Sequence, residues 1–177
     1  MFGKPLRYPL KVSPLSQKIT SNYGYRSFRG GAFHSALDLR AASGTPVIAP
    51  AAGRVDRTST GAGYSCGGNL RLDHSPALQT RYCHLREIYV SPGQEVKAGE
   101  VIALSGGDAA DPGAGNSQDA HLHFEVAARS PGGEWRLVDP NKYVRFGATG
   151  ASPLTIGLSL VVGVGGLTFL WWLRGQR

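Results

Sequence analysis

Charge is sparse in this 177-residue chain: Asp, Glu, Lys and Arg together make up 18% of it. The net charge of +7 comes from basic residues that are scattered, with no run of five or more. No aromatic-basic motif of the nucleic-acid-binding modules accompanies them. These absences argue against nucleic acid as a partner, whereas a scattered positive surface suits a polyanionic setting such as a bacterial envelope.

Cysteine is also scarce, with Cys66 and Cys83 alone and no Cys-x-x-Cys pair. A zinc site built on thiolates is therefore disfavoured. Residues 67–74 ("GGNLRLDH") and 80–85 ("TRYCHL") predict two strands joined by a turn, which would bring the two cysteines towards each other. A disulfide and a pair of buried free thiols both fit this arrangement, and the sequence does not choose between them.

The first 18 residues lack the continuous apolar stretch of a secretory signal peptide, because proline and lysine interrupt them every few positions. We expect residues 1–18 to form an irregular lead-in. Helix-favouring runs are scarce after it, while 25 Gly and 11 Pro break the chain into short segments. This pattern predicts an all-β fold, with one main domain over residues 19–145.

The most regular predicted strand is residues 119–126, "DAHLHFEV". Side chains two positions apart on a strand share a face, so His121, His123 and Glu125 should project together. Two imidazoles at this spacing are close enough to serve one centre. A chance pair on a surface strand would have the same spacing.

The C-terminal part of the chain has a different composition. Residues 146–153 ("FGATGASP") are typical of a linker, and residues 155–173 carry no charge. As a helix these 19 residues would be about 28 Å long, close to the ~30 Å hydrocarbon thickness of a bilayer. We expect a transmembrane helix over residues 154–174 that binds the lipid bilayer, with a basic tail at 175–177. An apolar core segment is the alternative.

Three segments occur in a fixed order: "FHSALDLRAASGTPVIA" at 33–49, "YCHL" at 82–85 and "HLHFE" at 121–125. In this order and spacing they resemble the LytM/lysostaphin-type zinc metallopeptidases, family M23, over about residues 22–144. The resemblance implies a fold of packed antiparallel sheets and one Zn²⁺ ion. It also implies the metal ligands His34, Asp38 and His123, and the catalytic histidines His84 and His121 beside the ion.

The chemistry of these residue types agrees with that assignment. Three protein ligands leave a fourth position for water, as a catalytic zinc site requires. Imidazoles next to the ion can transfer a proton and stabilise a developing oxyanion, and we assign both roles to His84 and His121 jointly. Glu125 should orient a ligand imidazole, with the role of a base as the alternative.

The remaining residues of interest lie before the first motif, at a predicted turn and in the loop before the His-x-His strand. An extended chain would hold the His34 and Asp38 side chains about 13 Å apart, so the backbone must bend, and we expect Gly30 and Gly31 to supply the slack. His74 and the neighbouring Asp73 are predicted to be solvated turn residues. The loop at 106–119 is longer and more acidic than is usual in the family, which suggests that it shapes substrate choice.

The expected function is hydrolysis of peptide cross-links in bacterial peptidoglycan by a membrane-anchored zinc endopeptidase. The basic tail would place the catalytic domain towards the periplasm or cell wall. The missing signal peptide and single-module build favour a phage-encoded protein that acts at lysis or assembles into a virion or another envelope complex. The alternative is a membrane-tethered, non-catalytic module that binds peptidoglycan or activates another cell-wall hydrolase.

Overall fold

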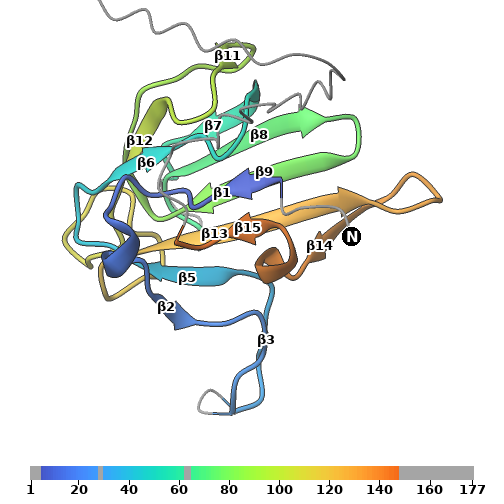
Figure 1. The fold of residues 1–177 in the computed structure, drawn as a ribbon. Helices are drawn as coiled ribbons and strands as arrows, with labels where there is room; N and C mark the ends of the chain where they lie inside the picture. The colour runs from blue at the N-terminus through green and yellow to red at the C-terminus, as the bar shows by residue number, and fades with distance from the viewer. Residues whose placement is uncertain (1–4, 28–29, 62–64, 148–177) are drawn as a thin grey trace, which may run out of the picture.

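The computed structural model describes residues 5–27, 30–61 and 65–147, and in these ranges two sheets form the body of the protein (Figure 1). The larger sheet has the strand order β11-β7-β8-β9-β13-β5-β2, and β14 pairs with the far end of β13. Its strands are β2 (Ile19–Ser21), β5 (Leu37–Arg40), β7 (Gly53–Ser59), β8 (Asn69–Ser75), β9 (Leu78–Cys83), β11 (Glu95–Val96), β13 (His121–Arg129) and β14 (Trp135–Val138).

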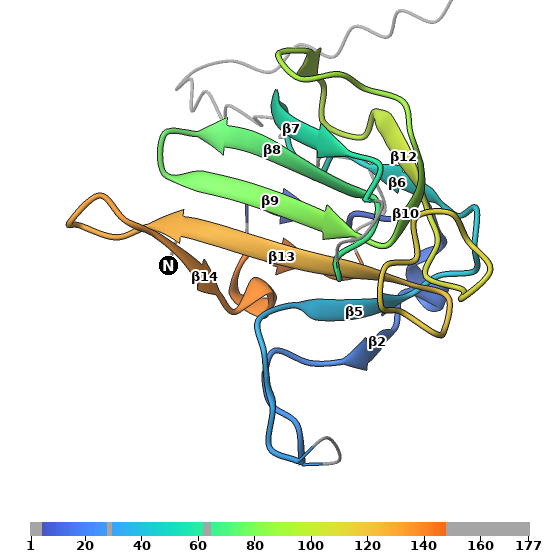
Figure 2. The same cartoon turned by 180° about the vertical axis from the view of Figure 1, so that it is seen from behind.

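The smaller sheet has the order β10-β12-β6 and lies behind one end of the larger one (Figure 2). Its strands are β6 (Pro46–Ile48), β10 (Leu85–Ile88) and β12 (Val101–Ser105). All pairings within both sheets are antiparallel. The prediction of an all-β fold with packed antiparallel sheets is therefore confirmed for the described residues.

Alternation along β13 separates the core from the site. Leu122, Phe124 and Val126 are fully buried and belong to the core cluster, which also contains side chains of the smaller sheet. The residues that alternate with them, His121, His123 and Glu125, are less buried, as expected for the opposite face of the strand.

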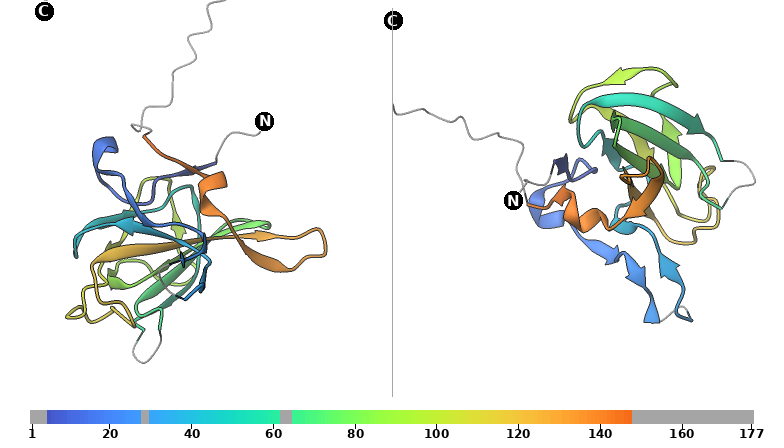
Figure 3. Two further views of the ribbon diagram at one scale, coloured as in Figure 1. Left: turned by 90° about the horizontal axis from the view of Figure 1, so that it is seen from below. Right: turned by 90° about the vertical axis from the view of Figure 1, so that its right-hand side faces the viewer.

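The lead-in is more ordered than the sequence suggested. Its strand β1 (Leu6–Arg7) pairs in parallel with β15 (Val144–Arg145), so the two ends of the described chain lie side by side (Figure 3). Three apolar side chains of this segment are buried in the core: Leu6, Tyr8 and Leu10. Prolines beside these residues made the alternation of buried side chains hard to recognise in the sequence. Short 3-10 helices lie at Pro14–Ser16 (η1) and Pro140–Lys142 (η3).

A two-stranded hairpin, β3 (Gly24–Tyr25) with β4 (Phe33–His34), projects from the body of the domain (Figures 1 and 3). Within the described ranges, the chain forms no helix of the length and apolarity that crossing a bilayer would require. The transmembrane helix expected over 154–174 lies outside those ranges.

Candidate metal centre and active site

The register of three adjacent strands builds the centre of the site. In the larger sheet β13 lies between β5 and β9, and His123 is paired with Asp38 on one side and with Cys83 on the other. Side chains directly opposite each other on an antiparallel pair have Cβ atoms about 5 Å apart. Asp38 and His123 are thus neighbours in the sheet although 85 residues separate them in the chain.

His34 reaches the same centre from the end of β4. The chain breaks its extended course at Ser35 and Ala36, between β4 and β5, and this bend brings His34 Nε2 to 3.1 Å from Asp38 Oδ1. The prediction that Gly30 and Gly31 supply the slack was wrong. Both have positive φ angles, 62° and 78°, and they form the turn of the β3–β4 hairpin instead.

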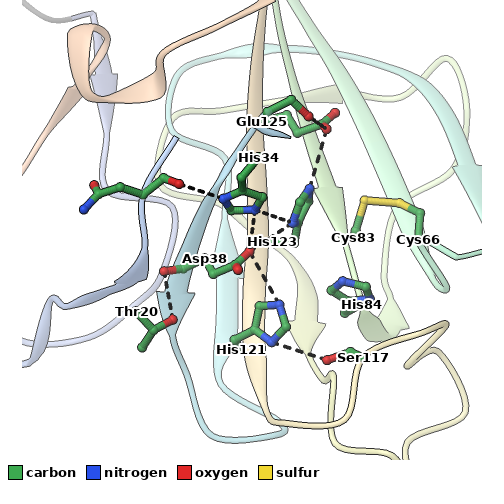
Figure 4. Close-up of polar contacts among 12 residues, drawn as sticks. Thr20, His34, Asp38, Cys66, Cys83, His84, Ser117, His121, His123 and Glu125 are labelled. Atoms are coloured by element: carbon green, nitrogen blue, oxygen red, sulfur yellow. Dashed lines mark hydrogen bonds and ion pairs between the residues drawn. A yellow bond between two sulfur atoms is a disulfide. The ribbon is translucent and has the colours of Figure 1, made fainter. Parts of the chain in front are cut away.

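The three atoms expected to bind the metal have tetrahedral spacing. Asp38 Oδ1 lies 3.0 Å from His123 Nδ1 and 3.1 Å from His34 Nε2, and the two nitrogens are 3.4 Å apart (Figure 4). Two ligand atoms at ordinary zinc distances and a tetrahedral angle would be about 3.3–3.4 Å apart. The three side chains can therefore hold one metal ion.

The hydrogen bonds of the two ligand imidazoles fix which nitrogen faces the centre. His34 Nδ1–H donates to the backbone carbonyl of Asn22 at 2.8 Å, which leaves the Nε2 lone pair free. His123 directs Nε2 to Glu125 Oε1 at 3.5 Å, so that Nδ1 faces the centre. Outer partners of this kind are the usual way in which a protein orients metal-binding histidines.

Glu125 is therefore placed to orient His123, as the sequence suggested. Its Oε1 also accepts a hydrogen bond from Ser35 Oγ at 3.0 Å, and its register partner on β9 is Arg81. Burial alone would raise the pKa of Glu125, but the contacts with His123, Ser35 and Arg81 outweigh burial and lower it. Glu125 is thus a fixed negative charge on the outer side of His123.

Asp38 has a partner, Arg26, that no sequence motif predicted. Arg26, just after β3, donates to Asp38 Oδ2 at 2.7 Å and leaves Oδ1 towards the two imidazoles. Burial alone would raise the pKa of Asp38, but hydrogen bonds and charges of His123 and His34 hold it well below its usual range. The pKa of His123 is raised to about 9, because Asp38 and Glu125 together outweigh its burial. The two carboxylates make this centre favourable for a cation.

His84 and His121 lie beside the same centre. His84 Nδ1–H donates to the carbonyl of Ala114, and His121 Nδ1–H donates to that of Asp119, each at 2.7 Å. The Nε2 of His121 is 3.6 Å from Asp38 Oδ1. The two imidazole ring centroids are 5.0 Å apart, and the hydrogen bonds at Nδ1 leave Nε2 of each ring for the site. Burial, with further contributions from His121 and His123, lowers the pKa of His84 to about 4.

The disulfide that the sequence left open is present: Cys66 and Cys83 are joined, with Cα atoms 5.0 Å apart. The bonded Cys83 directly precedes His84, whose φ angle of 60° is the one positive value found outside glycine among the described residues.

His74 is not a solvated turn residue. Its Nδ1–H donates to the carbonyl of Ala52 at 2.9 Å, and its Nε2 accepts from Thr80 Oγ at 2.8 Å. Burial lowers its pKa, although Ala52 and Asp73 oppose this effect. Asp73, also predicted to be solvated, accepts from Gln79 Nε2 at 2.6 Å. These contacts hold the β8–β9 hairpin and lie outside the metal centre.

The centre opens into a pocket of about 560 Å³. One wall comes from β2 and Arg26, and the other from residues 116–120, which belong to the long loop before β13. The loop thus borders the site, as a role in substrate choice would require.

A β-sheet site that presents two imidazoles and a carboxylate to one cation, with two further histidines beside it, is the arrangement of a metal-dependent hydrolase. The family model of peptidase family M23 matches residues 32–140 of the chain. The chain belongs to this family.

Two curated relatives are similar to this chain. An uncharacterized metalloprotease of Haemophilus influenzae is 44% identical over 52% of this chain and 18% of its own length. Peptidoglycan DD-endopeptidase ShyB of Vibrio cholerae is 36% identical over 55% of this chain and 21% of its own length. The chain thus spans only about a fifth of the length of these relatives.

Two solved structures resemble the fold. The first is a mutant catalytic domain of the prophage-encoded M23 protein EnpA from Enterococcus faecalis, with a TM-score of 0.61 and 30% identity, covering 76% of this chain and 95% of that one. The second is a zinc-containing peptidase from Vibrio cholerae, with a TM-score of 0.61 and 32% identity, covering 75% of this chain and 38% of that one.

Proposed function

We propose that this protein is a zinc-dependent endopeptidase that hydrolyses peptide cross-links of bacterial peptidoglycan. The observation that carries the proposal is the convergence of His34 Nε2, Asp38 Oδ1 and His123 Nδ1 within 3.4 Å of one another. The name of ShyB, a peptidoglycan DD-endopeptidase, supports the choice of substrate.

Zinc is the metal that best fits this donor set. Two imidazoles and one carboxylate, at tetrahedral spacing and with a fourth side open to a pocket, are typical ligands of a catalytic zinc ion. The similarity to a zinc-containing peptidase supports the same choice. When bound, zinc would polarise the scissile carbonyl and lower the pKa of a water ligand to about 7.

The protein's own residues would do the remaining work. Glu125 and the Asn22 carbonyl hold the ligand imidazoles in the orientation that points a lone pair inwards, and Arg26 keeps Asp38 from rotating. His84 and His121 have their outer nitrogens bonded to carbonyls, so each can accept a proton at Nε2 and return it to the leaving amine. A protonated Nε2 can also donate to the developing oxyanion.

The test is digestion of purified sacculi that contain either direct or glycine-bridged cross-links, followed by mass spectrometry of the released peptides. The wild-type protein should release fragments cut within the cross-links of at least one wall type. His123→Ala should lose both zinc and activity. Glu134→Gln is the matched control, because the exposed side chain of Glu134 pairs only with Arg136 among the described residues. Binding to sacculi without cleavage would instead favour a non-catalytic module or an activator of another hydrolase.

We further propose that residues 154–174 anchor the protein in a bilayer with the catalytic domain towards the cell wall, and that the protein is phage-encoded and associated with virions or lysis. The uncharged segment motivates the anchor, and the likeness to a prophage-encoded M23 protein supports the origin. Membrane fractionation of cells that express the full chain and a chain ending at residue 153 tests the anchor. Mass spectrometry of purified particles tests the origin, and absence of the chain from both particles and lysates would contradict it.

A further inference from the structure

His84 occupies a backbone position that the strand itself would not provide. Cys83 is paired with His123 on the site face of the sheet, whereas Tyr82 is paired with Phe124 in the core. By strand alternation, an extended residue 84 would face the core opposite Leu122. The left-handed backbone at His84, with φ of 60°, instead turns its imidazole towards the site. Non-glycine residues avoid this conformation, so it persists only where the surroundings impose it.

The segment around Cys66 imposes this conformation. The disulfide ties Cys66 to the residue directly before His84. Two backbone hydrogen bonds also join the Cys66 segment to the residues after Cys83. His84 N–H donates to the Cys66 carbonyl and Leu85 N–H donates to the Gly68 carbonyl, each at 2.8 Å. The chain is therefore fixed on both sides of the turn at His84.

The group that orients the imidazole is attached to the same segment through hydrogen bonds. The Ala114 carbonyl, which accepts from His84 Nδ1–H, belongs to the long loop before β13. That loop is docked on the Cys66 segment by hydrogen bonds from Gly68 N–H to the Gly113 carbonyl, at 2.9 Å, and from Asn116 N–H to the Ser65 carbonyl, at 3.0 Å.

Glycines allow the backbones of the loop and of the Cys66 segment to contact each other directly. A Cβ added to Gly67 would overlap the Gly113 carbonyl, and one added to Gly113 would overlap the Leu85 carbonyl. The three segments 65–68, 84–85 and 113–116 are thus packed together as one unit. The disulfide is its covalent member.

We propose that the Cys66–Cys83 disulfide and the loop docked on its segment are a positioning device that holds His84 in the active site. This inference rests on the proposed function. The groups that orient the ligands His34, Asp38 and His123 are the Asn22 carbonyl, Arg26 and Glu125, which lie outside the Cys66 segment and the docked loop. Loss of the disulfide should therefore release His84 and leave metal binding intact. The device also ties full activity to an oxidising compartment, where such bridges persist.

The test compares the wild-type protein with the double variant Cys66→Ala/Cys83→Ala, which leaves no unpaired thiol. The measurements are zinc per chain, the NMR signal of the His84 Nδ1 proton, and kcat and KM on a soluble cross-linked peptide. In the variant we expect unchanged zinc, loss of the hydrogen-bonded Nδ1 signal, at least a tenfold fall in kcat and a KM within about twofold of wild type. Wild-type kcat together with an intact Nδ1 signal would overturn the proposal.

A second variant perturbs the same unit with the disulfide in place, in case the first does not fold. Gly113→Ala drives a side chain into the Leu85 carbonyl and should reproduce the loss of kcat and of the Nδ1 signal. Gly132→Ala is the matched control, because its Cβ would meet only Ser130 Oγ at 3.8 Å, and it should behave as wild type. If the wild type cleaves no peptide, the proposed function fails, while the Nδ1 signal still decides whether the disulfide positions His84.

Discussion

Glu125→Gln is a sharp test of how the metal centre is oriented. The substitution keeps the shape of the side chain but removes the negative charge that faces His123 Nε2 from 3.5 Å. The Glu125 side chain is only 14% exposed, so water screens this charge weakly. The change should therefore weaken zinc binding while the three ligands stay in place.

The size of the expected loss in zinc affinity follows from the distance between Glu125 and His123. Loss of such an outer partner typically costs about 10- to 100-fold in metal affinity. A separation of 3.5 Å is at the long end for a hydrogen bond, so we expect the lower end, about tenfold or about 1.4 kcal/mol. Stability should fall as well, because Arg81, the register partner of Glu125, is partly buried and would lose a carboxylate that favours its charged form.

Competition with a fluorescent zinc chelator measures the affinity, and thermal unfolding of the metal-free proteins measures the stability. Glu134→Gln, at an exposed position, is the control for both assays. Zinc affinity of Glu125→Gln within twofold of wild type would refute the idea that Glu125 orients His123.

Three further outcomes are expected. Arg26→Gln removes the donor to Asp38 Oδ2 and should lower zinc affinity by about tenfold in the same chelator competition, and an unchanged affinity would show that Arg26 does not fix Asp38. A chelator such as EDTA should abolish release of peptides from sacculi and added zinc should restore it, whereas full activity without metal would contradict the proposed chemistry. The folded-state pKa of His74 is lowered by burial from its ordinary value of 6.5, so the unfolded chain binds the extra proton first as pH falls. Folding stability should be fully present above that value and decline below it, and urea unfolding at about pH 8 and about pH 5 should show a smaller loss in His74→Gln than in wild type.

Short-range pattern was enough to predict the strand that carries the histidines. Alternation placed His121, His123 and Glu125 on one face of β13, and the structure has them there. The motif order and its family resemblance predicted which residues should meet. The contact between these residues depends on the register of β5, β13 and β9. That register pairs residues far apart in the chain and has no local sequence signal.

The residues that were missed or misjudged depend on the same long-range geometry. Arg26 lies just after β3, 12 positions before Asp38, and no local sequence pattern predicts an ion pair between them. His74 looked like a turn residue, but its partners Ala52 and Thr80 come from another strand connection and from the adjacent strand. The bend before Asp38 falls at Ser35 and Ala36, without the glycine or proline that marks a break most strongly.

The most direct test of the account is the zinc content of purified protein, measured by inductively coupled plasma mass spectrometry in wild type and His123→Ala. The geometry predicts one zinc ion per chain in the wild-type protein and a large loss in the variant. A wild-type protein that stays folded but takes up no zinc from solution, or a variant that binds it equally well, would contradict the claim that His34, Asp38 and His123 form a metal centre.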